Sequence, residues 1–121
     1  MKLIFISIVC LVLAACTVAR PNPEIFTSAD KIIQAAESAG GDEFAPVEMR
    51  FAREKLASAH LGMEKQKYGV VVYLVEEAEI NAELAIEKSR TARLRRRVNE
   101  LRKSNEELDE SLRATFGDDF K

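Results

Sequence analysis

Apolar residues recur at steps of three and four along three stretches of this chain, which is the spacing of one face of an α-helix. The first stretch begins after Ser28, whose hydroxyl can cap a helix, and ends at Gly40 and Gly41. Glycine readily adopts the left-handed conformation that closes many helices. The apolar positions between these limits are Ala29, Ile32, Ile33, Ala36 and Ala39. The pattern predicts a short first helix.

A second stripe follows Pro46, a residue suited to the first turn of a helix. Its members are Met49, Ala52, Leu56, Ala59 and Met63. The polar run MEKQKY, bracketed by Gly62, Tyr68 and Gly69, predicts a turn after it. We expect the chain to reverse here and form a helical hairpin.

The third stretch, from Val70 to Phe116, contains neither Gly nor Pro. It predicts a single helix of up to about 70 Å. Its start, GVVVYLV, is β-branched enough for a strand, but no partner strand is available, which favours a buried helix start. The apolar stripe of its first half comprises Val71, Val75, Ala78, Ala82, Ala85, Ser89 and Ala92. The predicted fold class is all-α: a short helix plus a helical hairpin whose last long helix extends into a coiled-coil-like segment.

Near residue 93 the apolar line of this helix moves to a different face. It becomes a heptad seam consisting of Leu94, Val98, Leu101, Asn105, Leu108 and Leu112. We expect residues 28–92 to form a helical domain, residues 93–116 to project beyond it as an amphipathic or coiled-coil helix, and residues 117–121 to form a flexible tail. A seam with no intramolecular cover should bind a partner.

The alternative is a solitary exposed helix stabilised by ion pairs of about 0.2–0.5 kcal/mol each. Candidate pairs are Arg96–Glu100, Arg102–Glu106, Lys103–Glu107 and Asp109–Arg113. If a partner does bind, an oligomer of this chain is one option. A parallel homodimer would place Arg97 against Arg102, so an acidic partner or a higher oligomer is favoured.

The first residues have the layout of a secretory signal peptide: a positive start at Lys2 and a short apolar run. That run is shorter than the ~20 residues of a membrane-spanning helix. Leu13-Ala14-Ala15-Cys16 resembles the lipobox of bacterial lipoproteins. In that class the cysteine sulfur receives a diacylglycerol, the chain is cut just before the cysteine, and the new amine is usually acylated with a fatty acid such as palmitate. The resemblance implies that acyl chains on Cys16 attach the protein to a membrane. An ordinary signal peptide with an incidental cysteine is the alternative.

The residues after the cysteine refine this expectation. In that lipoprotein class an aspartate after the cysteine implies retention at the inner membrane, and here the residue is Thr17. The implied location is the outer membrane, facing the periplasm. Residues 1–15 would be the signal peptide, and residues 16–27, which contain Pro21 and Pro23, predict an extended tether.

Composition gives little support to catalysis. The formal net charge is −2, and there is one histidine, His60, outside any HExxH pattern. With Cys10 removed and Cys16 acylated, no thiol would remain for a disulfide, a metal or a reaction. The carboxylate line Glu76, Glu79, Glu83 and Glu87 has the spacing of a solvated helix face. The sequence therefore predicts a protein that is not an enzyme and uses no cofactor or metal.

The run RTARLRRR is strongly basic. Its candidate anion contacts are Arg93, Arg95, Arg96 and Arg97. Nucleic acid is excluded as a partner if the chain is exported, which leaves anionic lipid headgroups, lipopolysaccharide phosphates or an acidic protein. A merely solvated charged face is the alternative.

Much of the remaining chain resembles a bacterial family called domain of unknown function 4398, found in short envelope lipoproteins and sometimes fused to OmpA-like peptidoglycan-binding domains. The matching residues are Ala35-Ala36-Glu37, Phe44-Ala45-Pro46, Ala52-Arg53-Glu54-Lys55-Leu56, Tyr68, Glu76-Glu77-Ala78, Ala82, Leu84 and Ala85. The resemblance implies an α-helical envelope lipoprotein and transfers no catalytic residue.

Two functions remain. The first is a lipid-anchored helical scaffold or adaptor for another envelope component. The second is a structural tether between the outer membrane and peptidoglycan. Lys121 ends the chain and resembles the terminal lysine through which the murein lipoprotein is joined to peptidoglycan.

Overall fold

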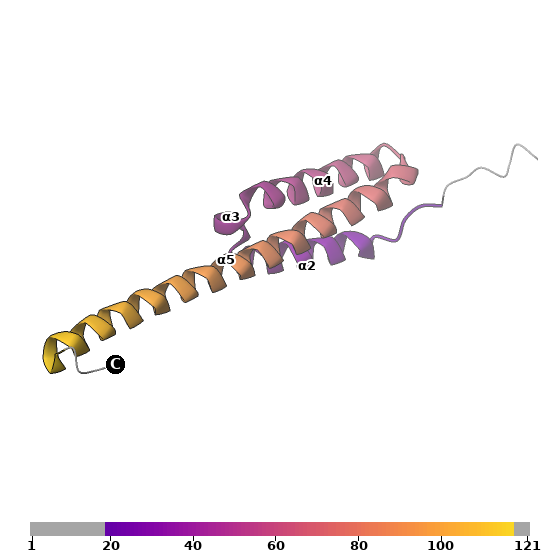
Figure 1. Cartoon of the computed structure of the whole chain (residues 1–121). Helices are drawn as coiled ribbons and strands as arrows, with labels where there is room; N and C mark the ends of the chain where they lie inside the picture. Colours follow the sequence, from indigo (N-terminus) through magenta and orange to yellow (C-terminus); the bar gives the residue numbers. More distant parts are fainter. Residues whose placement is uncertain (1–18, 118–121) are drawn as a thin grey trace, which may run out of the picture.

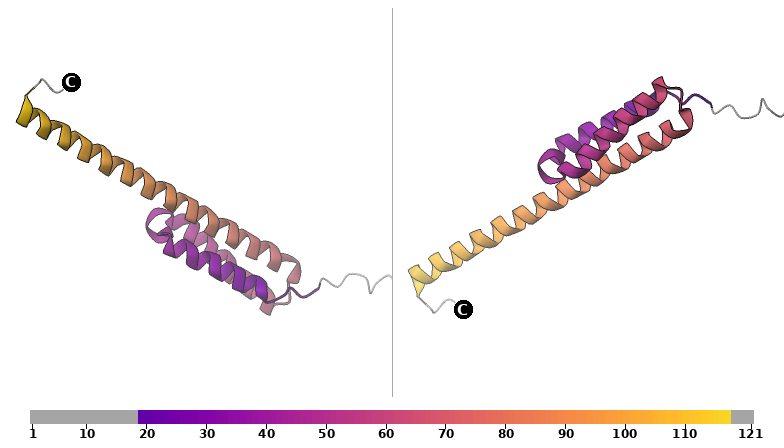
Figure 2. Two further views of the ribbon diagram at one scale, coloured as in Figure 1. Left: turned by 90° about the horizontal axis from the view of Figure 1, so that it is seen from below. Right: turned by 90° about the horizontal axis from the view of Figure 1, so that it is seen from above.

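The computed structural model describes residues 19–117, which form four helices. They are α2 (Glu24–Ser38), α3 (Gly41–Phe44), α4 (Pro46–Glu64) and α5 (Tyr68–Phe116). α2 and α4 pack along the first half of α5, and α3 covers one end of this bundle (Figure 1). The rest of α5 projects as a single helix, as both further views show (Figure 2). The all-α prediction, with a short helix, a hairpin and an extended last helix, is confirmed.

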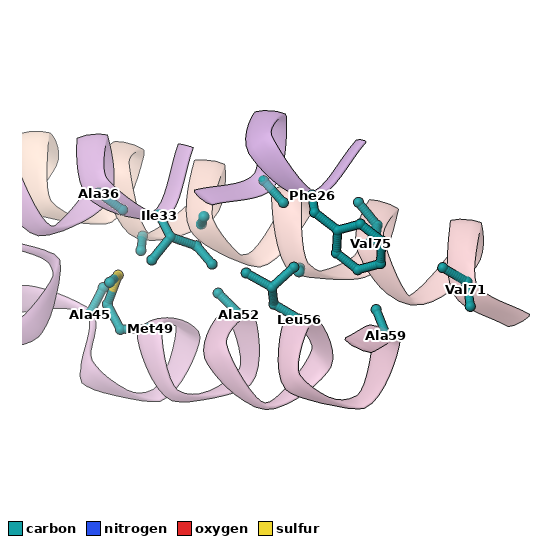
Figure 3. Close-up of a cluster of buried hydrophobic side chains, with 14 residues drawn as sticks. Phe26, Ile33, Ala36, Ala45, Met49, Ala52, Leu56, Ala59, Val71 and Val75 are labelled. Carbon is teal, nitrogen blue, oxygen red and sulfur yellow. The ribbon is translucent and has the colours of Figure 1, made fainter. Parts of the chain in front are cut away.

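The bundle core is built largely from alanine, and it lies between α2, α4 and α5 (Figure 3). Small side chains let the helices approach closely, but they bury little apolar area each. Larger side chains fill the gaps, with Met49 and Val71 fully buried and Phe26, Leu56 and Val75 nearly so. The buried positions of α4 and α5 coincide with the predicted stripes, except that Met63 and Ala92 are only half-buried and that Gly62 is buried in addition.

The valine-rich start of α5 is helical. Val71 and Val75 point into the core, whereas Val70 and Val72 are exposed. The preceding turn contains Gln66 in the left-handed region, at φ 55°. Gly62 belongs to α4 and not to this turn: a Cβ there would lie 3.1 Å from a Val71 methyl group. Its missing side chain lets α4 and α5 meet closely at the hairpin.

The start of the first helix was predicted incorrectly. α2 begins at Glu24, four residues before the predicted boundary at Ser28. Residues 24–27 of the predicted tether are therefore helical, and residues 16–18 lie outside the described part of the chain. Pro23 has helical φ and ψ of −56° and −21°, and the Asn22 side chain accepts a hydrogen bond of 3.1 Å from the Glu24 amide. Asn22 thus supplies the cap assigned to Ser28, and burial of Phe26 holds the extra turn in place.

The predicted glycine stop is correct, but it leads into an additional turn of helix. Gly40 has a φ of 85° and its amide donates to the Glu37 carbonyl at 2.9 Å, which closes α2. The next four residues form α3, which the sequence pattern did not predict. Gly41 and Ala45 are both buried, so this turn is part of the packed end of the bundle.

Ion pairs join the helices of the bundle at its surface. The Arg53 guanidinium donates to Glu37 at 2.7 Å and to both carboxylate oxygens of Asp42, at 2.8 and 3.1 Å. These bonds hold the pKa of the Asp42 carboxyl below its ordinary value. Lys55 bonds Glu77 at 2.5 Å, and Lys88 bonds Glu48. The helices are thus connected by charged groups around a thin apolar core.

Within residues 19–117, none of the helices combines the length and apolar character needed to cross a membrane.

Candidate docking surface on the projecting helix

The heptad seam of residues 94–112 lies on the part of α5 that extends past α2 and α4 (Figure 1). Its apolar side chains are open to solvent: Leu94 is 61% exposed, Val98 45%, Leu101 52% and Leu108 57%. Asn105 is exposed and Leu112 is half-buried. The structure therefore places the six predicted residues on one helix with no other described element over them.

The seam faces away from the bundle. At 100° per residue, the line through Leu94, Val98 and Leu101 lies about 140° around the helix axis from the buried line that ends at Ser89. The two apolar faces of α5 are thus nearly opposite. A second helix lying on the seam would not collide with α2 or α4.

The seam also extends further toward the start of α5 than the sequence reasoning recognised. Continuing backwards from Leu94 by the same steps of three and four leads through Thr91 and Glu87 to Leu84 and Ile80. Leu84 is 45% exposed and Ile80 is 62% exposed, on the outer side of α5 within the bundle. The sequence contains this extension, because the steps of three and four continue unbroken from Leu94 back to Ile80. It was not predicted, because the same segment also contains the alanine-rich stripe that is buried.

A shallow open groove runs beside the seam. It is lined by Thr91, Leu94, Arg95, Val98, Asn99 and Arg102. The lining combines the apolar side chains of Leu94 and Val98 with the basic side chains of Arg95 and Arg102. Such a groove suits a helix with its own apolar stripe and acidic flanks.

The arginine cluster does not form a single surface. Arg96 donates to Glu43 at 3.3 Å, and its guanidinium lies 5.4 Å from the centre of the Phe44 ring. The Arg93 side chain lies over Gly40. Both therefore join the end of the bundle to α5. Arg95 lines a hollow together with Phe44 of α3, and neither Arg95 nor Arg97 forms an ion pair within residues 19–117.

The ion pairs expected for a solitary helix form in part. Lys103 lies 3.8 Å from Glu107, and Arg113 bonds Asp109 at 2.9 Å. Arg96 bonds Glu43 on α3 in place of the predicted Glu100. These exposed pairs stabilise the helix only weakly and leave the apolar seam uncovered.

The titratable side chains of the bundle that form specific contacts are spread over its surface. His60 is exposed and stacks on Phe26, with ring centres 4.3 Å apart. Glu77 accepts hydrogen bonds from Lys55 and from the Tyr73 hydroxyl, which lowers the pKa of Glu77 and raises that of Tyr73. No group of three or more metal-ligating side chains occurs among the described residues. Cys16 and Lys121 lie outside the part of the chain that the structure describes.

Comparison with known proteins gives one match. The model of a family described as "Domain of unknown function (DUF4398)" matches residues 25–101. That range covers α2, α3, α4 and the first part of α5, including Leu94, Val98 and Leu101 of the seam. No curated protein and no solved structure matches the chain at a significant level.

Proposed function

We propose that this chain, which belongs to the family described as Domain of unknown function (DUF4398), is a lipid-anchored, non-catalytic scaffold or adaptor of the bacterial cell envelope. The observation that carries the proposal is the uncovered seam on the projecting part of α5. Exposed leucines at heptad spacing on a rigid helix are the usual means by which one helix recruits another. We infer that the seam docks onto a helical partner.

The membrane attachment follows from the lipobox resemblance at Leu13-Ala14-Ala15-Cys16. One acyl chain binds a bilayer only marginally, so durable anchoring through Cys16 requires two or more chains. The proposed location is the outer membrane, with the bundle in the periplasm. The N-terminal end of α2 lies at the opposite end of the molecule from the tip of α5 (Figure 2). The seam would therefore be held away from the anchoring point.

Photo-crosslinking in intact bacteria tests the docking role. A photoreactive residue at position 101 of the full chain should give a discrete crosslinked product. The second substitution Leu108→Asp should abolish that product, because it places a charge in the middle of the seam. The matched control is Leu61→Asp, which alters an equally exposed apolar residue on α4 and should leave the product unchanged. A product that survives Leu108→Asp contradicts the proposed docking surface.

Lipid attachment is tested separately. Cells expressing the chain should incorporate a labelled palmitate analogue into the protein. The variant Cys16→Ser should lose the label. The control variant Cys10→Ser should keep the label, because residue 10 belongs to the predicted signal peptide. An unlabelled protein with a free Cys16 thiol contradicts the anchor but leaves the docking surface intact.

A tether between the outer membrane and peptidoglycan is the second candidate function. It is favoured by the rod shape, which separates the two ends of the described chain by the full length of α5 (Figure 1). In this case digestion of purified cell wall should release peptides from the C-terminus bearing muropeptides on Lys121. The variant Lys121→Arg, which keeps the charge but changes the linking group, should release none.

A further inference from the structure

The charge of the projecting helix reverses along its length. Residues 88–103 contain one acid, Glu100, and the bases Lys88, Arg90, Arg93, Arg95, Arg96, Arg97, Arg102 and Lys103. Residues 104–113 contain one base, Arg113, and the acids Glu106, Glu107, Asp109 and Glu110. The helix is therefore complementary to itself when it is turned end to end.

We propose that the occupant of the seam is the same segment of a second copy of this chain, lying antiparallel to it. This inference rests on the docking role proposed above for the seam, and it names the partner. It depends on neither the lipid anchor nor the cellular location.

The apolar pattern fits this arrangement. The seam alternates the a and d positions of the heptad. In an antiparallel pair of helices, each a position lies beside a d position of the partner. With the symmetry axis near residue 103, Leu94 lies beside Leu112 of the second copy and Val98 beside Leu108 of the second copy. The exposed apolar side chains of each seam are then covered by those of the other. Asn105 lies near the axis, beside Leu101 of the second copy.

Two flanking ion pairs agree with the same register, and Arg102, which occupies the same flank, meets Arg102 of the other copy near the axis as a single like-charged contact. Arg95 and Asp109 occupy the same flank of the seam, and the antiparallel pairing brings Arg95 of each copy beside Asp109 of the other. Within one chain these residues are separated by about 21 Å of helix and cannot bond each other. Within residues 19–117, Asp109 is paired with Arg113 at the surface, where both side chains are more than half exposed. It can therefore exchange that partner at little cost.

The parallel arrangement lacks this complementarity. It would place Arg90 against Arg95 of the second copy and Arg97 against Arg102, so that four like-charged contacts would form in the dimer.

The seam from Leu94 to Leu112 is open to a second helix, because it faces away from α2 and α4. α3 approaches its beginning through Phe44, which lines a shallow hollow together with Thr91 and Arg95. The exposed Thr91 allows the second helix to continue past Leu94 to its end at Phe116, which lies opposite residue 90 of the first copy.

Charge exchange in the full chain, purified in detergent micelles, tests the orientation. Sedimentation equilibrium should show a reversible dimer. Asp109→Arg should weaken the dimer about tenfold or more, because it opposes Arg95 twice by symmetry. The double variant Arg95→Asp with Asp109→Arg should restore the affinity to within about threefold. Glu110→Arg, the same charge change one residue away from the flank, is the matched control and should have little effect.

Photo-crosslinking fixes the identity and register of the occupant. A photoreactive residue at position 98 should crosslink to the peptide 104–113 of a second copy, which contains Leu108. A crosslink to peptide 98–102 of the second copy would mean parallel pairing and overturn the inference. A crosslink to a different protein would also overturn it, while supporting the adaptor function. A chain that stays monomeric up to about 100 µM and gives no crosslinked product contradicts both the pairing with a second copy and the docking role of the seam.

Discussion

Gly41 has no room for a side chain. A Cβ at this position would lie 2.8 Å from the Ala36 carbonyl oxygen and 2.7 Å from the Met49 sulfur. Met49 can move, but the Ala36 oxygen belongs to the backbone of α2. The end of the bundle therefore depends on the closeness of α2, α3 and α4 at this residue.

We predict that Gly41→Ala lowers the free energy of unfolding by about 1–3 kcal/mol, because α2 must shift to admit one methyl group. Gly69→Ala is the control, since nothing lies within 4 Å of a Cβ there and alanine is the better helix former. Urea denaturation followed by circular dichroism measures both. Equal stability of the two variants would contradict the close packing at Gly41.

A second prediction concerns Arg53, which bonds Glu37 and Asp42. The pKa of Asp42 is lowered in the folded protein by hydrogen bonds from Arg53. A carboxyl with a lowered folded pKa stabilises the protein above its unfolded pKa, and this contribution is lost as the pH falls through the folded value. We expect Arg53→Gln to be less stable than the wild type at pH 7, with the difference shrinking below about pH 4.

Thermal unfolding at pH 7, 5 and 3 measures this effect. The groups are largely exposed, so the difference should also decrease in high salt. Arg50→Gln removes the same charge from the same helix and is the control. A difference between wild type and Arg53→Gln that is independent of pH would contradict the role of the Asp42 carboxylate.

At the scale of the element, alanine decides how closely the helices pack. Ala82 of α5 is fully buried, whereas Ala114 of the same helix is exposed. We predict that Ala82→Leu lowers the free energy of unfolding by about 1–3 kcal/mol through overpacking, while Ala114→Leu changes it by less than about 0.5 kcal/mol. Denaturant unfolding measures both, and a tolerated leucine at position 82 would mean that the bundle is loosely packed.

The helices themselves were largely predictable because their apolar stripes repeat at helical steps and end at glycine or polar turns. The start of α2 was missed although Phe26, Ala29, Ile33 and Ala36 already follow that spacing. Pro23 was predicted to be part of an extended segment. The spacing of apolar residues does not distinguish a proline in an extended segment from a proline that immediately precedes a helix. α3 has only four residues, too few to show a period.

The candidate site was predictable in its residues but not in its surroundings. The heptad spacing identifies the residues of the seam. Only the packing of the helices shows that Arg93 lies over Gly40 and that Arg96 bonds Glu43 of α3. Those contacts join positions more than fifty residues apart, and local spacing carries no information about them. The exposed continuation through Leu84 and Ile80 likewise became visible only when α2 and α4 were seen to occupy the other face.

At the scale of the whole molecule, a packed half and a solvated half share one helix. We predict that amides of residues 97–116 exchange with deuterium at least about tenfold faster than those of residues 71–89 in dilute solution, because no other element protects them. Hydrogen exchange with mass spectrometry measures both segments. Raising the protein concentration should slow exchange in residues 97–116 if the seam pairs with a second copy. Equal protection of the two halves at high dilution would contradict the isolation of the projecting segment.

α5 passes from the bundle to its tip with no glycine or proline between Val70 and Phe116. The 23 residues from Leu94 to Phe116 thus act as a lever arm of about 35 Å. Turning the bundle by about 10° would sweep the tip through roughly 6 Å, with no hinge to absorb the motion. Any contact that fixes the orientation of the alanine-rich bundle therefore also fixes the direction in which the leucines of the seam face.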